Sequence, residues 1–399
     1  METLMNTSRQ LLNDTDMVFV RYAINQVRWD QRLTGITGAR GVGKSTMMLQ
    51  YLKQNFPDSN EVLYASLDDL YFSGNTLLSL ADNFVMHGGT HLFLDEVHKY
   101  PGWSREIKNI YDRYRKLTVV FSGSSALDIY KGEADLSRRA LHFHLNGMSL
   151  REYIHLFYGL ETPVLSLNDI LNHGTKSADA IINAIKFPLK YLHEYYHLGV
   201  YPFAKEDEKG YHRRLLSTVN QVIETDLPAL FGVDYQAVVA LRKLLTIIAG
   251  LVPFKPNIAD LSREMGLSRE TVVRYIQFLV KADILSALYS NSGGMGQLSK
   301  PEKIYLNNPN LIFALAAFST PEIGTIRETF FMHQISAKHQ VNYSPISDFY
   351  VDEKFTFEIG GKPKKRSQIT GIKNAYVVKD DIEYGFGNII PLWLFGFMY

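Results

Sequence analysis

Residues 38–46 of the chain read Gly38-Ala39-Arg40-Gly41-Val42-Gly43-Lys44-Ser45-Thr46. This run fills every fixed position of the phosphate-binding pattern G-x-x-x-x-G-K-[ST]. Residues 32–37 before it can form a short buried strand, and residues 47–54 after it read as a helix, which is the order that the pattern requires. Glycines let backbone N–H groups turn toward a phosphate, and a helix N-terminus adds unpaired donors. We interpret the run as the floor of a nucleotide site.

Two side chains of this phosphate loop have specific expected roles. Lys44 should reach the β- and γ-phosphates, and the Ser45 hydroxyl should ligate Mg²⁺. The alternative is an ordinary glycine-rich turn, against which the flanking strand and helix argue. A nucleotide with Mg²⁺ is therefore the expected ligand.

A pair of carboxylates ends the apolar run at residues 91–94, namely Asp95 and Glu96. A strand buried on both faces reads as such a run, and ligands collect at the carboxyl ends of strands in open α/β sheets. Asp95 is the candidate second Mg²⁺ ligand. Glu96 is placed to orient or deprotonate an attacking water. The alternative is a plain strand end at the surface.

Serines follow another apolar run, residues 117–121. Either Ser122 or Ser124 could contact the γ-phosphate or the attacking water, and the sequence does not choose between them. Both could instead cap the next helix.

The elements around these motifs predict an α/β domain over residues 1–150 with a parallel sheet of the P-loop NTPase kind. We expect strands at 61–67, 91–96 and 117–121 and helices at 76–86 and 103–115. The sequence also predicts an N-terminal helix over residues 7–30, packed beside the first strand.

Composition limits the alternatives for the whole chain. A length of 399 residues predicts two or three domains. Lys plus Arg number 42 against 41 for Asp plus Glu, so overall charge favours neither nucleic acid nor membrane as a partner. The absence of cysteine excludes disulfides and thiolate metal sites. With no secretory signal and no apolar run long enough to span a bilayer, we expect a cytoplasmic protein.

Several motifs together resemble a family of prokaryotic AAA+ ATPases that carries a C-terminal domain of unknown function. They are the runs Gly38–Thr46, Asp95–Trp103, Ser122–Ser125, Asp135–Arg139 and Ser149–Tyr153. The resemblance implies ATP as the ligand and a positively charged finger from Arg138-Arg139. The family more often has Gly-Arg there, so Arg139 matches the finger arginine. Both arginines could instead pair with Glu133 and Asp135 at the surface.

Residues 151–232 predict a helical lid or connector, with helices around 166–173, 177–198 and 210–226 and a Ser149 cap on a helix through Tyr158. This region contains His193-Glu194-Tyr195-Tyr196-His197, which satisfies the zinc-protease pattern H-E-x-x-H. No third ligand is evident in the sequence. Histidine and aromatic packing is the favoured interpretation, and a zinc hydrolase is the alternative.

Residues 233–310 predict a winged helix. Helices at 258–265 and from Ser268 to Lys281 have helix-turn-helix spacing, and residues 284–289 and 303–306 supply a hairpin. Arg269, Arg274 and Lys281 lie on or beside the second helix, where DNA-reading side chains would sit. A protein contact is the alternative use of such a domain.

Residues 311–399 predict a small α+β domain that looks like a degenerate restriction endonuclease. Asp348 and Glu358 occupy the carboxylate positions, but Gly360 stands where a lysine is needed and the next lysine is Lys362. This departure argues against metal-dependent cleavage. The apolar C-terminal run, residues 391–399, should be docked against the domain.

The first functional hypothesis is therefore an ATPase in which hydrolysis moves the lid and the winged helix. Glu96, Lys44 and Arg139 would be catalytic, and Asp95 with Ser45 would hold Mg²⁺. The alternative is a nucleotide-gated switch that binds DNA or a protein with little turnover. An oligomer is compatible with either hypothesis.

Overall fold

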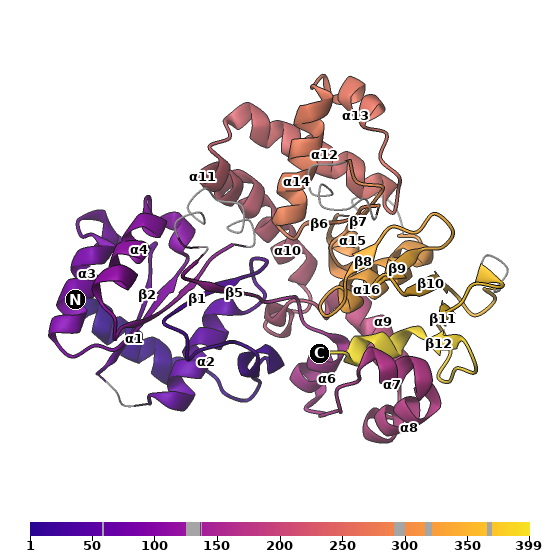
Figure 1. The fold of residues 1–399 in the computed structure, drawn as a ribbon, viewed down its shortest axis with the longest axis horizontal. Coiled ribbons are helices and arrows are strands. Elements are labelled where there is room, and N and C mark those ends of the chain that lie inside the picture. The colour runs from indigo at the N-terminus through magenta and orange to yellow at the C-terminus, as the bar shows by residue number, and fades with distance from the viewer. Residues whose placement is uncertain (58–59, 125–135, 137, 291–299, 316–320, 365–368) are drawn as a thin grey trace. The chain divides into compact units, whose positions relative to one another are not determined.

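The computed structural model describes the chain except residues 58–59, 125–135, 137, 291–299, 316–320 and 365–368 (Figure 1). The chain forms two compact units. The first comprises Met1–Gly147 together with Gln221–Asp234, and the second comprises Met148–Asn220 and Tyr235–Tyr399. The segment Gln221–Asp234 thus belongs to the first unit, although its neighbours in sequence on both sides belong to the second.

A parallel five-stranded sheet forms the core of the first unit, in the order β2-β3-β4-β1-β5. Its strands are β1 (Leu33–Thr37), β2 (Val62–Ser66), β3 (His91–Asp95), β4 (Thr118–Ser122) and β5 (Leu141–His144). The middle strands are apolar and buried because helices cover both faces. The register pairs Ser66 with Asp95 and Ile36 with Ser122, so the carboxyl ends of these strands meet at one edge.

The helices of the first unit follow the predicted βα order. They are α1 (Glu2–Asp14), η1 (Tyr22–Asn25), α2 (Lys44–Asn55), η2 (Leu70–Ser73), α3 (Leu77–Met86), η3 (Val97–Lys99), α4 (Trp103–Arg113), η6 (Val222–Asp226) and α11 (Leu227–Phe231). The helix expected from about residue 76 is present, and Thr76 caps it, because its hydroxyl accepts the N–H of Ser79 at 3.1 Å. The expected α/β fold of this unit is confirmed.

The predicted helix over residues 7–30 is wrong. Helix α1 ends at Asp14, and the Asp16 side chain then accepts the N–H of Val18 at 2.7 Å, which turns the backbone out of the helix. The Gln50 side chain donates to the carbonyls of Asp16 and Phe19, each at 2.8 Å. A long-range contact therefore stabilises a conformation that local periodicity could not indicate.

The second unit begins with helices that the sequence placed only approximately. They are α6 (Leu150–Tyr158), α7 (Leu167–Asn172), α8 (Gly174–Ile185), α9 (Pro188–Leu198), η5 (Pro202–Lys205) and α10 (Tyr211–Gln221). Ser149 caps α6 in a reciprocal capping box with Glu152, as predicted. The single helix expected over 177–198 is wrong, because Pro188 cannot donate a helical hydrogen bond and begins the new helix α9.

A helix-turn-helix and a hairpin follow in the predicted order. The elements are α12 (Tyr235–Leu251), α13 (Ile258–Met265), α14 (Arg269–Lys281), β6 (Leu285–Leu288) and β7 (Lys303–Leu306). Gly266, with φ 66°, ends α13, and Ser268 caps α14. The strands pair antiparallel, and residues 291–299 of their connection lie outside the described residues. Arg269 and Arg274 are exposed on α14, and Lys281 is half-buried.

The C-terminal part of the second unit is α+β, as predicted. Helices α15 (Pro309–Leu315) and α16 (Ile323–Ile335) precede β8 (Val341–Asn342), β9 (Phe349–Val351), β10 (Phe355–Gly360), β11 (Ala375–Lys379), β12 (Ile389–Pro391) and η9 (Leu392–Phe397). The sheet order is β12-β11-β10-β9-β8. The apolar terminus is docked, since Trp393 and Phe395 are fully buried and the Ser149 hydroxyl donates to a main-chain oxygen of Tyr399 at 2.8 Å.

Candidate functional site

The phosphate loop connects β1 to α2 and depends on glycine at its two ends. Gly38 has φ 149°, and a Cβ there would lie 2.4 Å from the Leu145 carbonyl oxygen. Gly43 has φ 95° and precedes α2 without a side-chain cap. The first N–H groups of α2 are therefore exposed to the loop rather than capped, which is the arrangement that binds an anion.

Lys44 lies folded over this loop. Its Nζ donates to the carbonyl oxygens of Gly38 at 2.8 Å and Ala39 at 3.0 Å, and the residue is only 6% exposed. A phosphate bound in the loop would offer this ammonium group a stronger, charged acceptor. Of the other loop residues, Val42 is buried, Gly41 and Thr46 are exposed, and Arg40 is half-buried.

Asp95 ends β3 in a buried network of hydroxyl groups. Its Oδ1 accepts from the Ser122 hydroxyl and, at 3.0 Å, from the N–H of Glu96, while its Oδ2 accepts from the Tyr64 hydroxyl at 2.5 Å. Burial raises the pKa of Tyr64 and the Asp95 charge raises it further, whereas a hydrogen bond with Ser45 lowers it. Ser45 and Asp95 thus meet at one hydroxyl, from elements far apart in sequence.

Tyr64 was not identified from the sequence. It lies in the middle of β2 within an apolar run, where a tyrosine is typical of an ordinary core position. Its role at Asp95 depends on the pairing of β2 with β3, which a single strand cannot reveal.

Glu96 has a left-handed backbone, with φ 51° and ψ 40°. Its Oε2 lies 3.3 Å from His98 Nε2 and 4.0 Å from Arg40 Nη1 of the phosphate loop. A non-glycine residue in this conformation is uncommon and clusters at functional sites. The carboxylate is therefore directed toward the phosphate loop rather than out along the strand.

Asp226 joins the same charged cluster from η6 and was missed by the sequence analysis. Its Oδ1 lies 3.0 Å from Lys99 Nζ and 3.5 Å from His98 Nε2, and its Oδ2 lies 3.4 Å from Arg40 Nη1. The side chain is 1% exposed. Burial acts to raise the pKa of Asp226, but the hydrogen bond and charge of His98 and then of Lys99 lower it to about 2.

A sequence signal for Asp226 did exist. It shares a helical face with Val222 and Leu230, which are both buried. A lone carboxylate on an apolar helical face needs a charged partner. What the sequence could not indicate is that its charged partners would lie 127 residues earlier at Lys99 and 186 residues earlier at Arg40 in the phosphate loop.

The two candidate serines and Arg139 lie in different places. Ser122 contacts Asp95, and Ser124 is also buried, at 5% exposure. Arg139 instead forms a two-point ion pair with Asp112, with Nε to Oδ1 at 3.0 Å and Nη2 to Oδ2 at 3.1 Å. The suggested partners Glu133 and Asp135 lie outside the described residues.

Arg139 lies near the amino-terminal ends of the strands, whereas the phosphate loop of the same chain lies at their carboxyl-terminal ends. It precedes β5, which runs parallel to β1 with Thr34 opposite Leu141 and Thr37 opposite His144. Arg139 therefore lies at the edge where β1 begins, whereas the loop follows the end of β1. The structure does not bring this arginine to Lys44, Asp95 or Glu96 within one chain.

The zinc-protease pattern does not assemble as a two-histidine site. His193 faces Asp381 and Asp380, while the His197 ring packs on Phe313 with centroids 3.9 Å apart. The Glu194 carboxylate accepts from the Tyr158 hydroxyl at 2.5 Å. The two histidines thus have different partners, and only His193 lies beside carboxylates.

In the C-terminal domain, Lys364 rather than Lys362 reaches Glu358. Its Nζ lies 2.5 Å from Glu358 Oε1. Asp348 accepts the N–H of Ile359 at 2.8 Å and lies 3.7 Å from Lys303 Nζ. The carboxylates of the nuclease-like pattern are therefore paired with lysines that its local spacing does not provide.

Family models match two parts of the chain. Residues 30–154 match a model described as AAA domain, and residues 189–322 match a domain of unknown function. Among the described residues, no helix is long and apolar enough to cross a membrane.

An uncharacterized protein of Methanocaldococcus jannaschii is 25% identical over 280 residues, which are 67% of this chain and 59% of that protein. The chain thus matches less than two thirds of this relative's length.

Three solved structures are similar at low identity. The Aeropyrum pernix ORC1 protein in complex with DNA has a TM-score of 0.30 at 12% identity, covering 79% of this chain and 91% of that chain. AMPPCP-bound DnaA from Aquifex aeolicus has a TM-score of 0.27 at 14% identity, covering 65% of this chain and 84% of that chain. PCH-2 from C. elegans has a TM-score of 0.26 at 13% identity, covering 69% of this chain and 68% of that chain.

Proposed function

We propose that residues 30–154, which match a model described as AAA domain, bind ATP with Mg²⁺ and hydrolyse it to ADP and phosphate. The observation that carries the proposal is the convergence of the phosphate loop with Asp95 at one edge of the sheet. Lys44 and the start of α2 supply positive charge for the phosphates. The Ser45 hydroxyl and the Asp95 carboxylate are oxygen donors of the kind that Mg²⁺ prefers.

Bound Mg²⁺ would neutralise charge on the β- and γ-phosphates. In this proposal Ser45 and Asp95 hold it, and Tyr64, which hydrogen-bonds Asp95, keeps that carboxylate oriented. Ser122 also donates to Asp95 and so acts in the same way. Ser124 then remains the candidate for a direct contact with the γ-phosphate.

Glu96 is the proposed general base. Its carboxylate is directed toward the loop and is 21% exposed, so a water can reach it. Arg40 and His98 lie beside Glu96 and would have to give way to the γ-phosphate and the attacking water. The two carboxylates Glu96 and Asp226 compete with the nucleotide for the same Arg40.

Asp226 links this competition to the rest of the chain. It lies in the segment Gln221–Asp234, both ends of which continue into the second unit. When phosphates attract Arg40, Asp226 loses part of its pairing, and the resulting shift can pass along the backbone in both directions. This supports the proposal that ATP turnover moves those parts of the predicted lid and winged helix that lie in the second unit, residues 151–220 and 235–310.

Arg139 is proposed to act on the nucleotide of a neighbouring subunit. Its position at the opposite edge of the sheet argues against a role at its own phosphate loop. An arginine from another chain would stabilise charge that develops on the transferred phosphoryl group. This proposal requires an oligomer.

A nucleotide-gated switch with little turnover is the second candidate function. It is favoured by the pairing of Glu96 with His98 and Arg40, which occupies the proposed base. Exposed Arg269 and Arg274 on α14 offer a surface for a DNA or protein partner. DNA binding would show a steep fall in affinity with salt, whereas a protein partner need not.

Calorimetry with ATP in the presence and absence of Mg²⁺ tests the proposal. Wild-type protein should bind one nucleotide per chain, and Lys44→Ala should weaken the affinity by about tenfold or more, because a charge-assisted hydrogen bond is lost. Lys53→Ala is a matched control, since Lys53 lies on the same helix and donates to carbonyls of Asn13 and Thr15. Equal affinity of wild type and Lys44→Ala would overturn the proposed site.

A further inference from the structure

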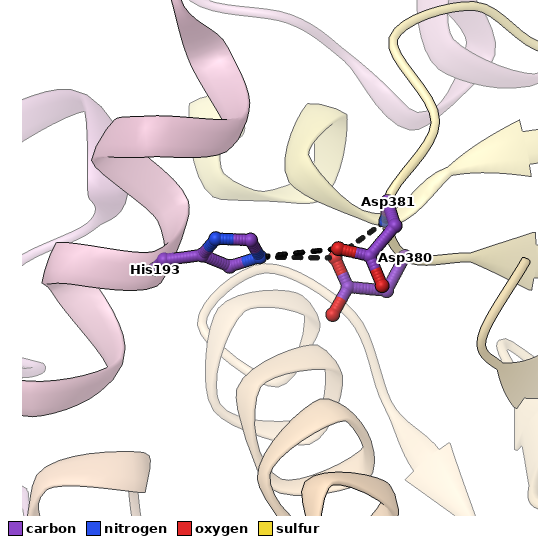
Figure 2. A group of neighbouring side chains, drawn as sticks. All are labelled: His193, Asp380 and Asp381. Carbon is purple, nitrogen blue, oxygen red and sulfur yellow. Dashed lines mark hydrogen bonds and ion pairs between the residues drawn. The ribbon is translucent and has the colours of Figure 1, made fainter.

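A second group of polar side chains lies in the second unit, away from the phosphate loop in sequence (Figure 2). It consists of His193 on α9 and of Asp380 and Asp381, which directly follow β11. Nε2 of His193 lies 3.3 Å from Asp381 Oδ1 and 4.0 Å from Asp380 Oδ1. We propose that these three side chains bind a divalent transition-metal ion, with Zn²⁺ the best match to the ligand types.

The three donor atoms all lie within 4.8 Å of one another, and the two distances from His193 can be compared with those in a small coordination sphere. Zinc bonds of about 2.0–2.2 Å to His and Asp in tetrahedral geometry place two ligand atoms roughly 3.3–3.5 Å apart. The His193–Asp381 distance of 3.3 Å already meets this requirement. The His193–Asp380 distance of 4.0 Å exceeds it by an amount that a small rotation of the half-exposed imidazole can remove.

The two carboxylates are held so that one oxygen of each faces the histidine. Arg327 donates through Nε to Asp380 Oδ2 at 2.9 Å and through Nη2 to Asp381 Oδ2 at 3.0 Å. The Tyr196 hydroxyl also donates to Asp380 Oδ2, at 3.3 Å. Hydrogen-bonded carboxylates of this kind orient metal ligands and raise their affinity.

The net charge of the group favours binding of a cation. Two carboxylates lie against the single guanidinium of Arg327, so with a neutral imidazole the group carries a net negative charge. The Asp380 side chain is fully buried, and burial of excess negative charge is costly. A divalent ion would offset it.

The site is open to solvent on the other side. The side chains of His193 and Asp381 are 50% and 44% exposed. An ion could therefore enter without unfolding, and water would complete its coordination sphere. This is an exchangeable site, and it is independent of the proposed nucleotide site because none of its residues belongs to the first unit.

A pure ion pair between protonated His193 and the carboxylates is the competing explanation. The two explanations differ in what they require of the imidazole, because a protonated ring cannot ligate a metal. Only the metal-site explanation predicts that added metal ion binds to these side chains; the ion-pair explanation predicts no such binding.

The test is titration of the full-length, tag-free chain with Co²⁺, followed by visible absorption, and with Zn²⁺ by calorimetry, in the absence of nucleotide. We expect one equivalent to bind, with Zn²⁺ displacing Co²⁺, and His193→Ala to weaken binding by at least about tenfold. His197→Ala is the matched control, since it alters the other histidine of the same motif but no carboxylate contact. It should bind like wild type.

Asp381→Asn provides a second variant if His193→Ala folds poorly by circular dichroism, because it removes a charge at a half-exposed position with little change in shape. It too should weaken binding. No saturable binding to wild type, or unchanged binding to a folded His193→Ala or Asp381→Asn protein, would overturn the proposal. An equal loss in His197→Ala would also overturn it and would restore the two-histidine interpretation. ATP binding by all these variants should equal that of wild type.

Discussion

Glu96 is proposed to act only after ATP has bound, so its removal should separate turnover from affinity. Glu96→Gln preserves the size of the side chain and its contact with Arg40 but removes the base. We expect nucleotide affinity to stay within a small factor of wild type and the hydrolysis rate to fall by about 10². Steady-state phosphate release and calorimetry on the same samples measure both. Undiminished turnover would remove Glu96 from the mechanism.

Asp226 should make a pH-dependent contribution to the stability of the first unit. Its pKa is lowered to about 2 from an ordinary value of 3.8, so the contribution is present above about pH 4 and is lost as the pH falls toward 2. The shift corresponds to about 2 kcal/mol. Asp226→Asn should therefore be less stable than wild type by about that amount at pH 7.

Chemical denaturation of both proteins between pH 7 and pH 2 measures this difference in the free energy of unfolding. It should shrink as the pH falls below about 4. Glu224→Gln is the control, because Glu224 is exposed on the same segment. A pH-independent difference would mean that the Asp226 charge is not what stabilises the cluster.

Individual site residues were predictable to the extent that their roles are local. Lys44 and Asp95 belong to short motifs whose geometry depends on residues close to them in sequence, so the sequence alone indicates them. Tyr64 and Asp226 are not, because strand pairing and a returning segment bring them to the site. Arg139 matched its family position, yet the register of β5 puts it at the opposite edge of the sheet.

At the scale of helices and strands, the sequence predicted best the elements with strong end signals. Ser149 and Ser268 each cap a helix where expected, and Thr76 caps the helix that was expected to begin near it. Errors occurred where apolar periodicity continued across a break, as at Pro188, or where a distant side chain such as Gln50 held an irregular segment. Periodicity reports which face is buried, but it does not report where the backbone turns.

The Ser149 cap should matter more than an ordinary helix cap. Besides the box with Glu152, its hydroxyl donates to a main-chain oxygen of Tyr399, and Ser149 is fully buried. Ser149→Ala should lower the free energy of unfolding by about 2 kcal/mol, the upper end of the range for a cap. Ser166→Ala is the control, because Ser166 has a similar box with Asp169 but is exposed.

For the control Ser166→Ala, we expect the free energy of unfolding to fall by about 1 kcal/mol. Urea unfolding of the two variants, followed by tryptophan fluorescence, gives both values, since Trp393 lies in the docked terminus. Equal losses would show that the contact with Tyr399 adds nothing to the cap.

At the scale of the whole molecule, the position of Arg139 predicts activity that depends on assembly. Lys44→Ala and Arg139→Ala chains should each hydrolyse ATP poorly. Mixed together, they should regain activity, because an intact phosphate loop from one chain can then meet an intact arginine from another. Phosphate release from the mixture, compared with each variant alone at the same total concentration, measures the recovery.

Asp112→Ala is the control for this experiment, since it removes the carboxylate that pairs with Arg139 but keeps the arginine. It should retain activity when tested alone. Failure of the mixture to exceed its components would contradict action between chains.

The late return of Gln221–Asp234 to the first unit has a consequence for biosynthesis. As the chain leaves the ribosome, the sheet can form once residue 147 has emerged. Arg40 and Lys99 can pair with Asp226 only later, after residue 226 has been translated. Through that interval the cations beside the phosphate loop lack the Asp226 carboxylate, although Glu96 already lies 4.0 Å from Arg40. Cellular nucleotide, already present at that stage, is a natural counter-ion for them and so could act as a folding ligand.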